Sequence, residues 1–290
     1  MMAFVHILFA LVLAPLLLGV INRTKALFAG RNGQPLLQLY YDLAKLLRKG
    51  AVYSRTTSWV FRAGPIAGLA AVVAALAIVP FAGTGAPVSF AGDLVLFAYL
   101  FGLMRFFTVI AALDTGSSFE GMGASREVQF AALAEPVLFL ALAALARRTG
   151  SLSLSGILGA VTPSEPVWAL VAVALLVVLL AENARIPVDD PNTHLELTMI
   201  HEVMVLDHGG PDFAFILYGA ALKLWVLGAL LVGVVLPGEN ILLSLVAMLA
   251  LAVVVGVIES TMARLRLLRV PQLLVGAGAL AALALILVMR

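Results

Sequence analysis

Eight apolar segments, each about as long as one membrane crossing, dominate this 290-residue sequence. A helix needs about 20 predominantly apolar residues to span the hydrocarbon core of a bilayer. Hydrophobic residues make up 63% of the chain and charged residues 12%, and its mean hydropathy is +1.11. Neither an internal repeat nor a linker is evident, so we expect an all-α polytopic membrane protein with one domain over residues 1–290. The segments are 2–21, 63–82, 91–113, 128–147, 166–186, 212–236, 240–259 and 271–289.

Lysine and arginine set the expected orientation. They concentrate in 22–62 and 260–270, which should therefore be cytoplasmic. With eight crossings, 114–127 and 187–211 also become cytoplasmic, and both termini face outside. Arg147 and Arg148 then lie on the outer side, which is the one poor fit. The first segment lacks a basic n-region and a small-residue cleavage site, so we interpret it as a retained helix. The net charge of +2 reflects this topology and does not indicate nucleic acid.

An acidic, histidine-rich stretch interrupts the apolar pattern at residues 181–212. It holds seven of the sixteen acids and three of the four histidines. His194, His201 and His208 are seven residues apart, about 10 Å per step on a helix, which is too far for one metal ion. A plain solvated loop is the alternative interpretation. Because the stretch carries the apolar runs 195–199 and 203–206, we favour a functional loop that folds as a helix under the membrane domain.

Ionisable residues inside the apolar segments suggest a second functional feature. Such groups are costly in hydrocarbon and normally face a partner or water. They could be neutralised in pairs, Glu135 with Arg105 or Lys223 and Glu182 with Arg185. A series that runs from mid-membrane to the acidic loop is more typical of a proton or ion path, and we favour that interpretation. The predicted pathway residues are Glu135, Glu182, Arg185, Lys223 and Arg105.

Segment 34–50 has a different character. Leucine and tyrosine recur at helical spacing, and the other face is charged. Pro35 suits the first turn of a helix and Gly50 suits its end. We therefore predict an interfacial amphipathic helix that anchors the chain to the lipid bilayer. It could also form one side of a binding site for a partner.

Cysteine is absent from the sequence. The chain therefore cannot hold an iron–sulfur cluster through thiolates. His6 is the only histidine in an apolar segment, which excludes a bis-histidine haem inside the bilayer. We expect no metal, no cofactor and no catalytic residue in this chain, so any redox centre must belong to a partner.

Three blocks of the sequence resemble the complex I subunit 1 family, which holds the quinone chamber of respiratory complex I. GASREVQFAALAEP is similar to the family's cytoplasmic loop and next helix, with Arg126 and Glu135. AENARIPVDDPNTHLEL is similar to its A-E-x-x-R-x-P-F-D stretch. QPLLQLYYDLAKLLRK is similar to its interfacial helix. The resemblance covers essentially the whole chain and implies eight spans with an outside N-terminus.

Departures from the quinone-reactive pattern are informative. Asn192 and His194 stand where that pattern has acids, and His201 and Met204 replace a phenylalanine and a glutamate. PVDDPNTHLELTMIHEVMVL and ESTMARLRLLRVPQLL instead resemble the group 4 membrane-bound hydrogenase branch, which includes formate hydrogenlyase. The altered loop therefore predicts no quinone-dependent electron transfer.

The hydrogenase resemblance implies a non-catalytic membrane subunit in the cytoplasmic membrane of a prokaryote. It would anchor a hydrophilic arm that carries iron–sulfur clusters and a NiFe centre, and would adjoin antiporter-like subunits. Redox charge would shift the 187–211 loop and bias protonation of Glu196, Glu182 and Glu135. Alternatives are the quinone-binding subunit of complex I, a stand-alone ion transporter and a passive anchor. The predicted redox-arm coupling residues are Arg126, Asp189, Asp190, His194, Glu196, His201, Glu202 and Asp207.

Overall fold

Helices make up all the regular structure in the described part of the chain. A computed structural model describes residues 2–161, 166–190, 199–238 and 240–289. The α-helices are α1 (Met2–Phe28), α2 (Gln38–Leu47), α3 (Trp59–Ile78), α4 (Asp93–Asp114), α5 (Ser118–Thr149), α6 (Leu154–Gly159), α7 (Pro166–Glu182), α8 (Gly210–Val235), α9 (Ile241–Thr261) and α10 (Val270–Met289), with two short 3₁₀ turns, Glu202–Val205 and Leu267–Arg269.

Each of the eight predicted spans corresponds to an apolar helix. Seven helices of the described residues are long and apolar enough to cross a membrane, and α7 is a shorter apolar helix of 17 residues. The all-α polytopic architecture predicted from the sequence is therefore confirmed.

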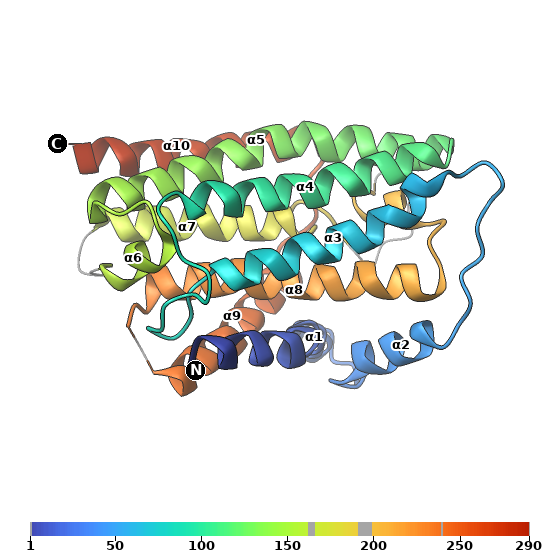
Figure 1. Cartoon of the computed structure of the whole chain (residues 1–290), viewed down its shortest axis with the longest axis horizontal. Helices are drawn as coiled ribbons and strands as arrows, with labels where there is room; N and C mark the ends of the chain where they lie inside the picture. The colour runs from blue at the N-terminus through green and yellow to red at the C-terminus, as the bar shows by residue number, and fades with distance from the viewer. Residues whose placement is uncertain (1, 162–165, 191–198, 239, 290) are drawn as a thin grey trace.

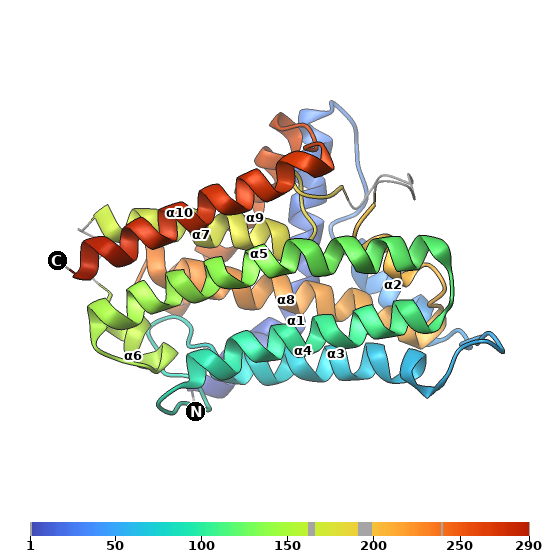
Figure 2. The same ribbon diagram turned by 90° about the horizontal axis from the view of Figure 1, so that it is seen from above.

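Helix α8 forms the centre of the bundle. It is the most buried of the spans, and it packs against α1, α2, α3, α7 and α9. Figures 1 and 2 show α3, α4, α5, α7 and α8 running in a similar direction, whereas α1 crosses them obliquely. The apolar core around α8 includes Leu222 and Trp225, and both side chains are essentially inaccessible.

Helix α5 extends further than the sequence predicted. The expected loop 114–127 is mostly helical, because α5 begins at Ser118 and continues for 32 residues. At 1.5 Å per residue it is about 48 Å long, well beyond a hydrocarbon core of about 30 Å. The extension was missed because residues 118–127 are too polar to score as a span. It places Glu127 and Glu135 on one continuous helix.

Helix α7 is shorter than its predicted span of 166–186. Its end is a Schellman motif, in which the Arg185 N–H donates to the Leu180 carbonyl at 2.8 Å and the Ala184 N–H donates to Ala181 at 3.1 Å. Ala184 has a φ of +49°, a left-handed conformation that usually falls to glycine. At 17 residues α7 rises only about 25 Å. The irregular backbone that follows it lies inside the bundle, because residues 185–189 are buried. Such backbone is tolerated at membrane depth where protein or a cavity surrounds it.

The structure agrees with the prediction for the amphipathic helix but differs from the prediction for the acidic loop. Helix α2 lies within the predicted segment 34–50 and buries none of its residues, which agrees with a helix whose apolar face is left for another surface. In the loop, the predicted helix over 203–206 is only the 3₁₀ turn Glu202–Val205. Most of the other predicted helical run, 195–199, lies outside the described residues.

Candidate functional site

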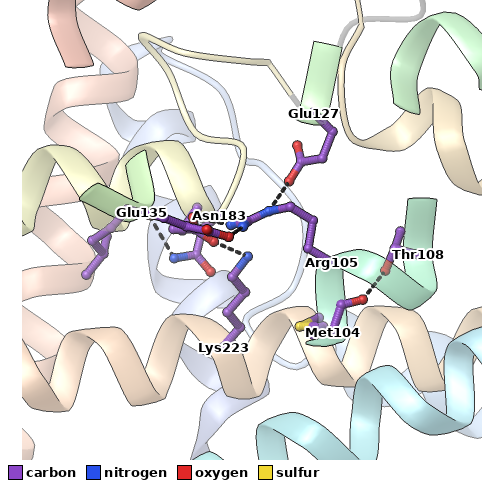
Figure 3. Close-up of polar contacts among 9 residues, drawn as sticks. Met104, Arg105, Thr108, Glu127, Glu135, Asn183 and Lys223 are labelled. Atoms are coloured by element: carbon purple, nitrogen blue, oxygen red, sulfur yellow. Dashed lines mark hydrogen bonds and ion pairs between the residues drawn. The ribbon is translucent and has the colours of Figure 1, made fainter. Parts of the chain in front are cut away.

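Three carboxylates converge on the guanidinium of Arg105. Arg105 projects from α4, and its Nε donates to Glu127 at 3.2 Å. Its two terminal nitrogens pair with Glu135 and with Glu182. Figure 3 shows Arg105 reaching between Glu127 and Glu135, which both project from α5. The guanidinium thus joins α4, α5 and the end of α7, and we refer to Arg105, Glu127, Glu135, Glu182 and Lys223 as the charged cluster.

Lys223 completes the charged cluster from α8. Its Nζ lies 2.7 Å from Oε2 of Glu182, and the side chains of both residues are at most 7% exposed. The Lys223 ammonium also lies 5.7 Å from the centre of the Phe101 ring. Since two cations face three carboxylates, the cluster carries a net charge of −1 when every group is ionised. Of the five predicted pathway residues, four therefore meet at one site.

Arg185 belongs to a different group. The predicted alternative pair of Glu182 with Arg185 is wrong, because the turn after α7 carries the Arg185 side chain toward α9. There Arg185 lies 3.3 Å from Glu259, whose other oxygen is 2.7 Å from Lys25 of α1. Glu259 is fully buried, and both cations compensate its charge.

Asp189 fastens the acidic loop to the connection between α9 and α10. One carboxylate oxygen accepts the N–H groups of Ile200 and His201 at 3.0 and 3.2 Å. The other lies 2.9 Å from Arg264. The Leu265 N–H also donates to the Pro187 carbonyl at 2.9 Å. A displacement of the loop would therefore also displace the end of α7 and the connection that follows α9.

The remaining loop residues are distributed along the same face of the bundle. Arg126 donates to the Met199 carbonyl at 2.9 Å, and the Asp207 N–H donates to Glu120 at 3.1 Å. Asp190 follows the Asp189 clamp and donates its N–H to that side chain. The 3₁₀ turn contains Glu202. Two predicted coupling residues, His194 and Glu196, lie outside the described residues.

An amphipathic cavity of about 400 Å³ lies between α1, α2, α8 and the acidic loop. Its apolar wall includes Leu18 of α1 and Leu39 of α2. Its polar lining comprises Asn22, Asn183, Arg185, His201, Glu202 and His208. The Nε of Arg185 and the Nδ1 of His208 are both buried without a hydrogen-bond partner among the described residues. Arg185 and His208 thus line the cavity, although these two nitrogen atoms are not exposed to it.

Both described loop histidines line this cavity, and both are biased toward the neutral form. Burial lowers the pKa of His208 to about 4, although Asp212 and Asp207 act in the opposite direction. His208 stacks on Phe61 with ring centres 3.9 Å apart. Burial likewise lowers the pKa of His201. Among the described residues there is no group of three or more histidine, cysteine or acidic side chains placed to hold a metal ion.

Sequence reasoning missed several residues of these sites. Glu127 was missed because it was assigned to a loop, although it lies two helical turns from Glu135 on the same helix. Lys25 and Arg264 lie in the basic segments 22–62 and 260–270, whose charge indicates only topology, and Glu120 lies in the expected loop 114–127. Their partners are distant in sequence, so no local pattern could have indicated the pairings.

Comparison with known proteins identifies the family. All 290 residues match the family described as NADH dehydrogenase. The chain belongs to this family. It is the complex I subunit 1 family that the sequence blocks predicted.

Two relatives from Escherichia coli (strain K12) support a branch within the family. Formate hydrogenlyase subunit 4 is 34% identical over 90% of this chain and 89% of its own length. Hydrogenase-4 component C is 31% identical over 94% and 91%.

A solved structure shares the fold of this subunit 1 family member. A chain of the membrane-bound sulfane sulfur reductase, an archaeal respiratory membrane complex, superimposes with a TM-score of 0.86. The match covers 99% of this chain and 98% of that chain, at 22% sequence identity. At that identity the comparison establishes the fold alone.

Proposed function

We propose that this chain is the membrane subunit of a hydrogenase complex of the formate hydrogenlyase type. It would anchor a cytoplasmic arm containing iron–sulfur clusters and a NiFe centre, and it would couple electron transfer in that arm to translocation of protons or sodium ions. Neighbouring antiporter-like subunits would carry the ions. The chain itself would perform no redox step, and it would reside in the cytoplasmic membrane of a prokaryote.

The charged cluster is the observation that carries this proposal. Ionisable side chains within spans are costly, so a cluster of five requires a compensating role. Passive anchoring needs none of them. The cluster joins α4, α5, α7 and α8, and only two residues separate Glu182 from Arg185 of the loop turn. Both relatives are, by name, parts of formate hydrogenlyase or hydrogenase systems, which supports a place for this chain in such a complex.

Competition for Arg105 supplies the mechanism. Three carboxylates share one guanidinium, so a proton on any one of them strengthens the hold of Arg105 on the other two. A charge change at the docked arm would displace the loop that Asp189 fastens, and thereby the turn that follows Glu182. The altered position of Glu182 would shift Arg105 and Lys223, and the affinity of Glu135 for a proton would change. Electrostatic coupling of this kind requires no electron to enter the membrane subunit.

Purification of the tagged chain from its native membrane tests the proposal. We expect hydrophilic subunits to co-purify in fixed proportion, with nickel and iron in the preparation and hydrogen-linked redox activity. Reconstituted complex should move ions during turnover. A chain that is isolated alone, remains folded and transports ions without partners would contradict the proposal and indicate a stand-alone transporter.

Quinone binding is a second candidate because the cavity lies where that hypothesis requires it. The chamber is beside α2, and its lining combines apolar side chains with polar ones that include Asn22, Asn183 and Arg185. Against this, Asn192 and His194 replace the expected acids. We expect the native complex to show no quinone-dependent turnover and no response to quinone-site inhibitors. Inhibitor-sensitive turnover together with quinone bound in the purified complex would favour the complex I alternative.

A further inference from the structure

Glu135 is the one member of the charged cluster that reaches the outer surface of the bundle. Its side chain is 42% exposed, whereas those of Glu182 and Glu127 are 6% and 16% exposed. It lies about 25 Å along α5 from Ser118, near the middle of a crossing. A carboxylate in that position would meet lipid tails, which can neither donate a hydrogen bond nor compensate charge.

The helix backbone beside Glu135 also contains a hydrogen-bond acceptor that lacks a donor. Pro136 has no N–H, so the carbonyl of Ala132, four residues earlier, lacks its usual helical donor. Ala132 is exposed on the same face of α5. A second acceptor therefore stands one helical turn from the carboxylate.

Two stripes of matching spacing surround these acceptors. On α4 the stripe is Val95, Tyr99, Gly102 and Phe106, and on α5 it is Val128, Ala132, Glu135 and Phe139. Both follow a 4–3–4 spacing, which keeps residues on one face for packing against another helix. Seven of the eight residues are apolar or small, and the stripe members are exposed or half-buried. Figures 1 and 2 show α4 beside α5, and we call the two stripes the α4–α5 face.

Small residues at the centre of this face permit close approach. A Cβ added to Gly102 would stand 3.8 Å from Oε1 of Glu135, in ordinary contact, so nothing within the chain requires glycine there. Small residues at membrane helix interfaces let the backbones come together. Gly102 and Ala132 thus leave room for a helix from outside the chain.

We propose that the α4–α5 face binds a transmembrane helix of a neighbouring subunit that brings a basic, hydrogen-bond-donating side chain to Glu135. The charged cluster has three carboxylates and two cations, so a third cation would neutralise it. A second copy of this chain is disfavoured, because a two-fold contact would place Glu135 against Glu135. The inference rests on the proposed function, because it identifies where the ion path leaves this subunit.

Two leucine substitutions in the intact complex test the proposal. Gly102→Leu fills the centre of the α4–α5 face, while Gly276→Leu adds the same side chain to an exposed glycine of α10 that has open space around it. We expect Gly102→Leu to lower the recovery of one neighbouring membrane subunit about tenfold or more, with the hydrophilic arm retained. Gly276→Leu should retain both. Equal recovery of every membrane subunit in the two variants would overturn the proposal.

Photo-crosslinking identifies the occupant and its chemistry. A photoreactive phenylalanine analogue at Phe106 or Phe139 should capture a helix of another subunit, and the captured peptide should contain a lysine, arginine or histidine. Capture of lipid alone, of a second copy of this chain, or of a helix without a basic residue would contradict the proposal. The proposed function fails separately, if the unmodified complex lacks a redox arm.

Discussion

At the residue scale, Arg105 contributes more to the stability of the charged cluster than Glu135 does. Arg105 is 8% exposed and is shared by three carboxylates, whereas Glu135 is one of those three and is partly exposed. Removing the cation would leave Glu127, Glu135 and Glu182 with only Lys223 to compensate them. Removing the Glu135 charge leaves Arg105 with two carboxylates. Under the proposed function, Arg105 therefore stabilises the charged cluster, whereas Glu135 serves in ion movement.

Glu135→Gln should leave the subunit at normal abundance in the membrane, since glutamine keeps an acceptor oxygen for Arg105. Arg105→Met should deplete the subunit, because a broken buried ion pair costs about 3–5 kcal/mol. Quantitative blotting of membranes measures both. Depletion by Glu135→Gln to the level of Arg105→Met would mean that Glu135 is a structural counter-ion.

His208 predicts a pH dependence of stability. Its pKa in the folded chain is lowered to about 4, below the unperturbed value of about 6.5. The unfolded chain therefore gains a proton first as the pH falls, so the contribution of neutral His208 is complete above pH 6.5 and declines between pH 6.5 and 4. The decline could reach about 3 kcal/mol.

Thermal unfolding of the purified complex at pH 7 and pH 5 measures this effect. His208→Gln has no titratable ring, so its melting temperature should fall less over the same interval. An equal fall in the variant and the unmodified complex would exclude His208 as the cause.

At the scale of elements, the end of α7 determines how the loop meets the charged cluster. The helix stops at Glu182, and the left-handed Ala184 turns the chain so that Arg185 contacts Glu259 while Glu182 faces Arg105. An apolar pattern alone extends this helix to residue 186, because Ala184 and Ile186 are as apolar as the helix itself. The stop is set by the turn hydrogen bonds and by the ion pairs on either side of it.

Ala184→Val should destabilise this turn, because a β-branched residue is strongly disfavoured at positive φ. The expected cost is about 1–3 kcal/mol, seen as lower subunit abundance and weaker retention of the arm. Ala184→Gly is the matched control and should retain or raise abundance, since glycine adopts this conformation freely. Similar abundance for valine and glycine would indicate that the turn is not left-handed in the assembled complex.

At the scale of the whole molecule, the sequence predicted the fold well and the site in part. Long apolar segments identified seven helices long enough to cross a membrane and the shorter α7, because hydrophobic length is a local property. Four of the five predicted pathway residues meet in one cluster, because an ionisable residue in an apolar span is conspicuous. The partners Glu127, Lys25 and Arg264 were not predicted, because ion pairs between distant helices depend on packing that no local pattern records.

Membrane orientation remains a prediction at this scale. Reporter tags at Arg31 and Arg266 should lie in the cytoplasm, and a tag after Arg290 should lie outside. The accessibility of each tag in intact and permeabilised cells shows on which side of the membrane it lies. A cytoplasmic C-terminal tag would mean that one of the eight helices does not cross the membrane.

The central claim is that the charged cluster couples redox turnover in the arm to ion movement. The number of ions moved per electron, measured in vesicles that contain the purified complex, tests it directly. Glu135→Gln should lower this ratio severalfold, while electron transfer to an artificial acceptor stays near normal. Asp42→Asn, an acid of α2 that bonds Gln38 at 3.0 Å, serves as the control and should keep the full ratio. An unchanged ratio in Glu135→Gln, in an intact complex, would contradict the account.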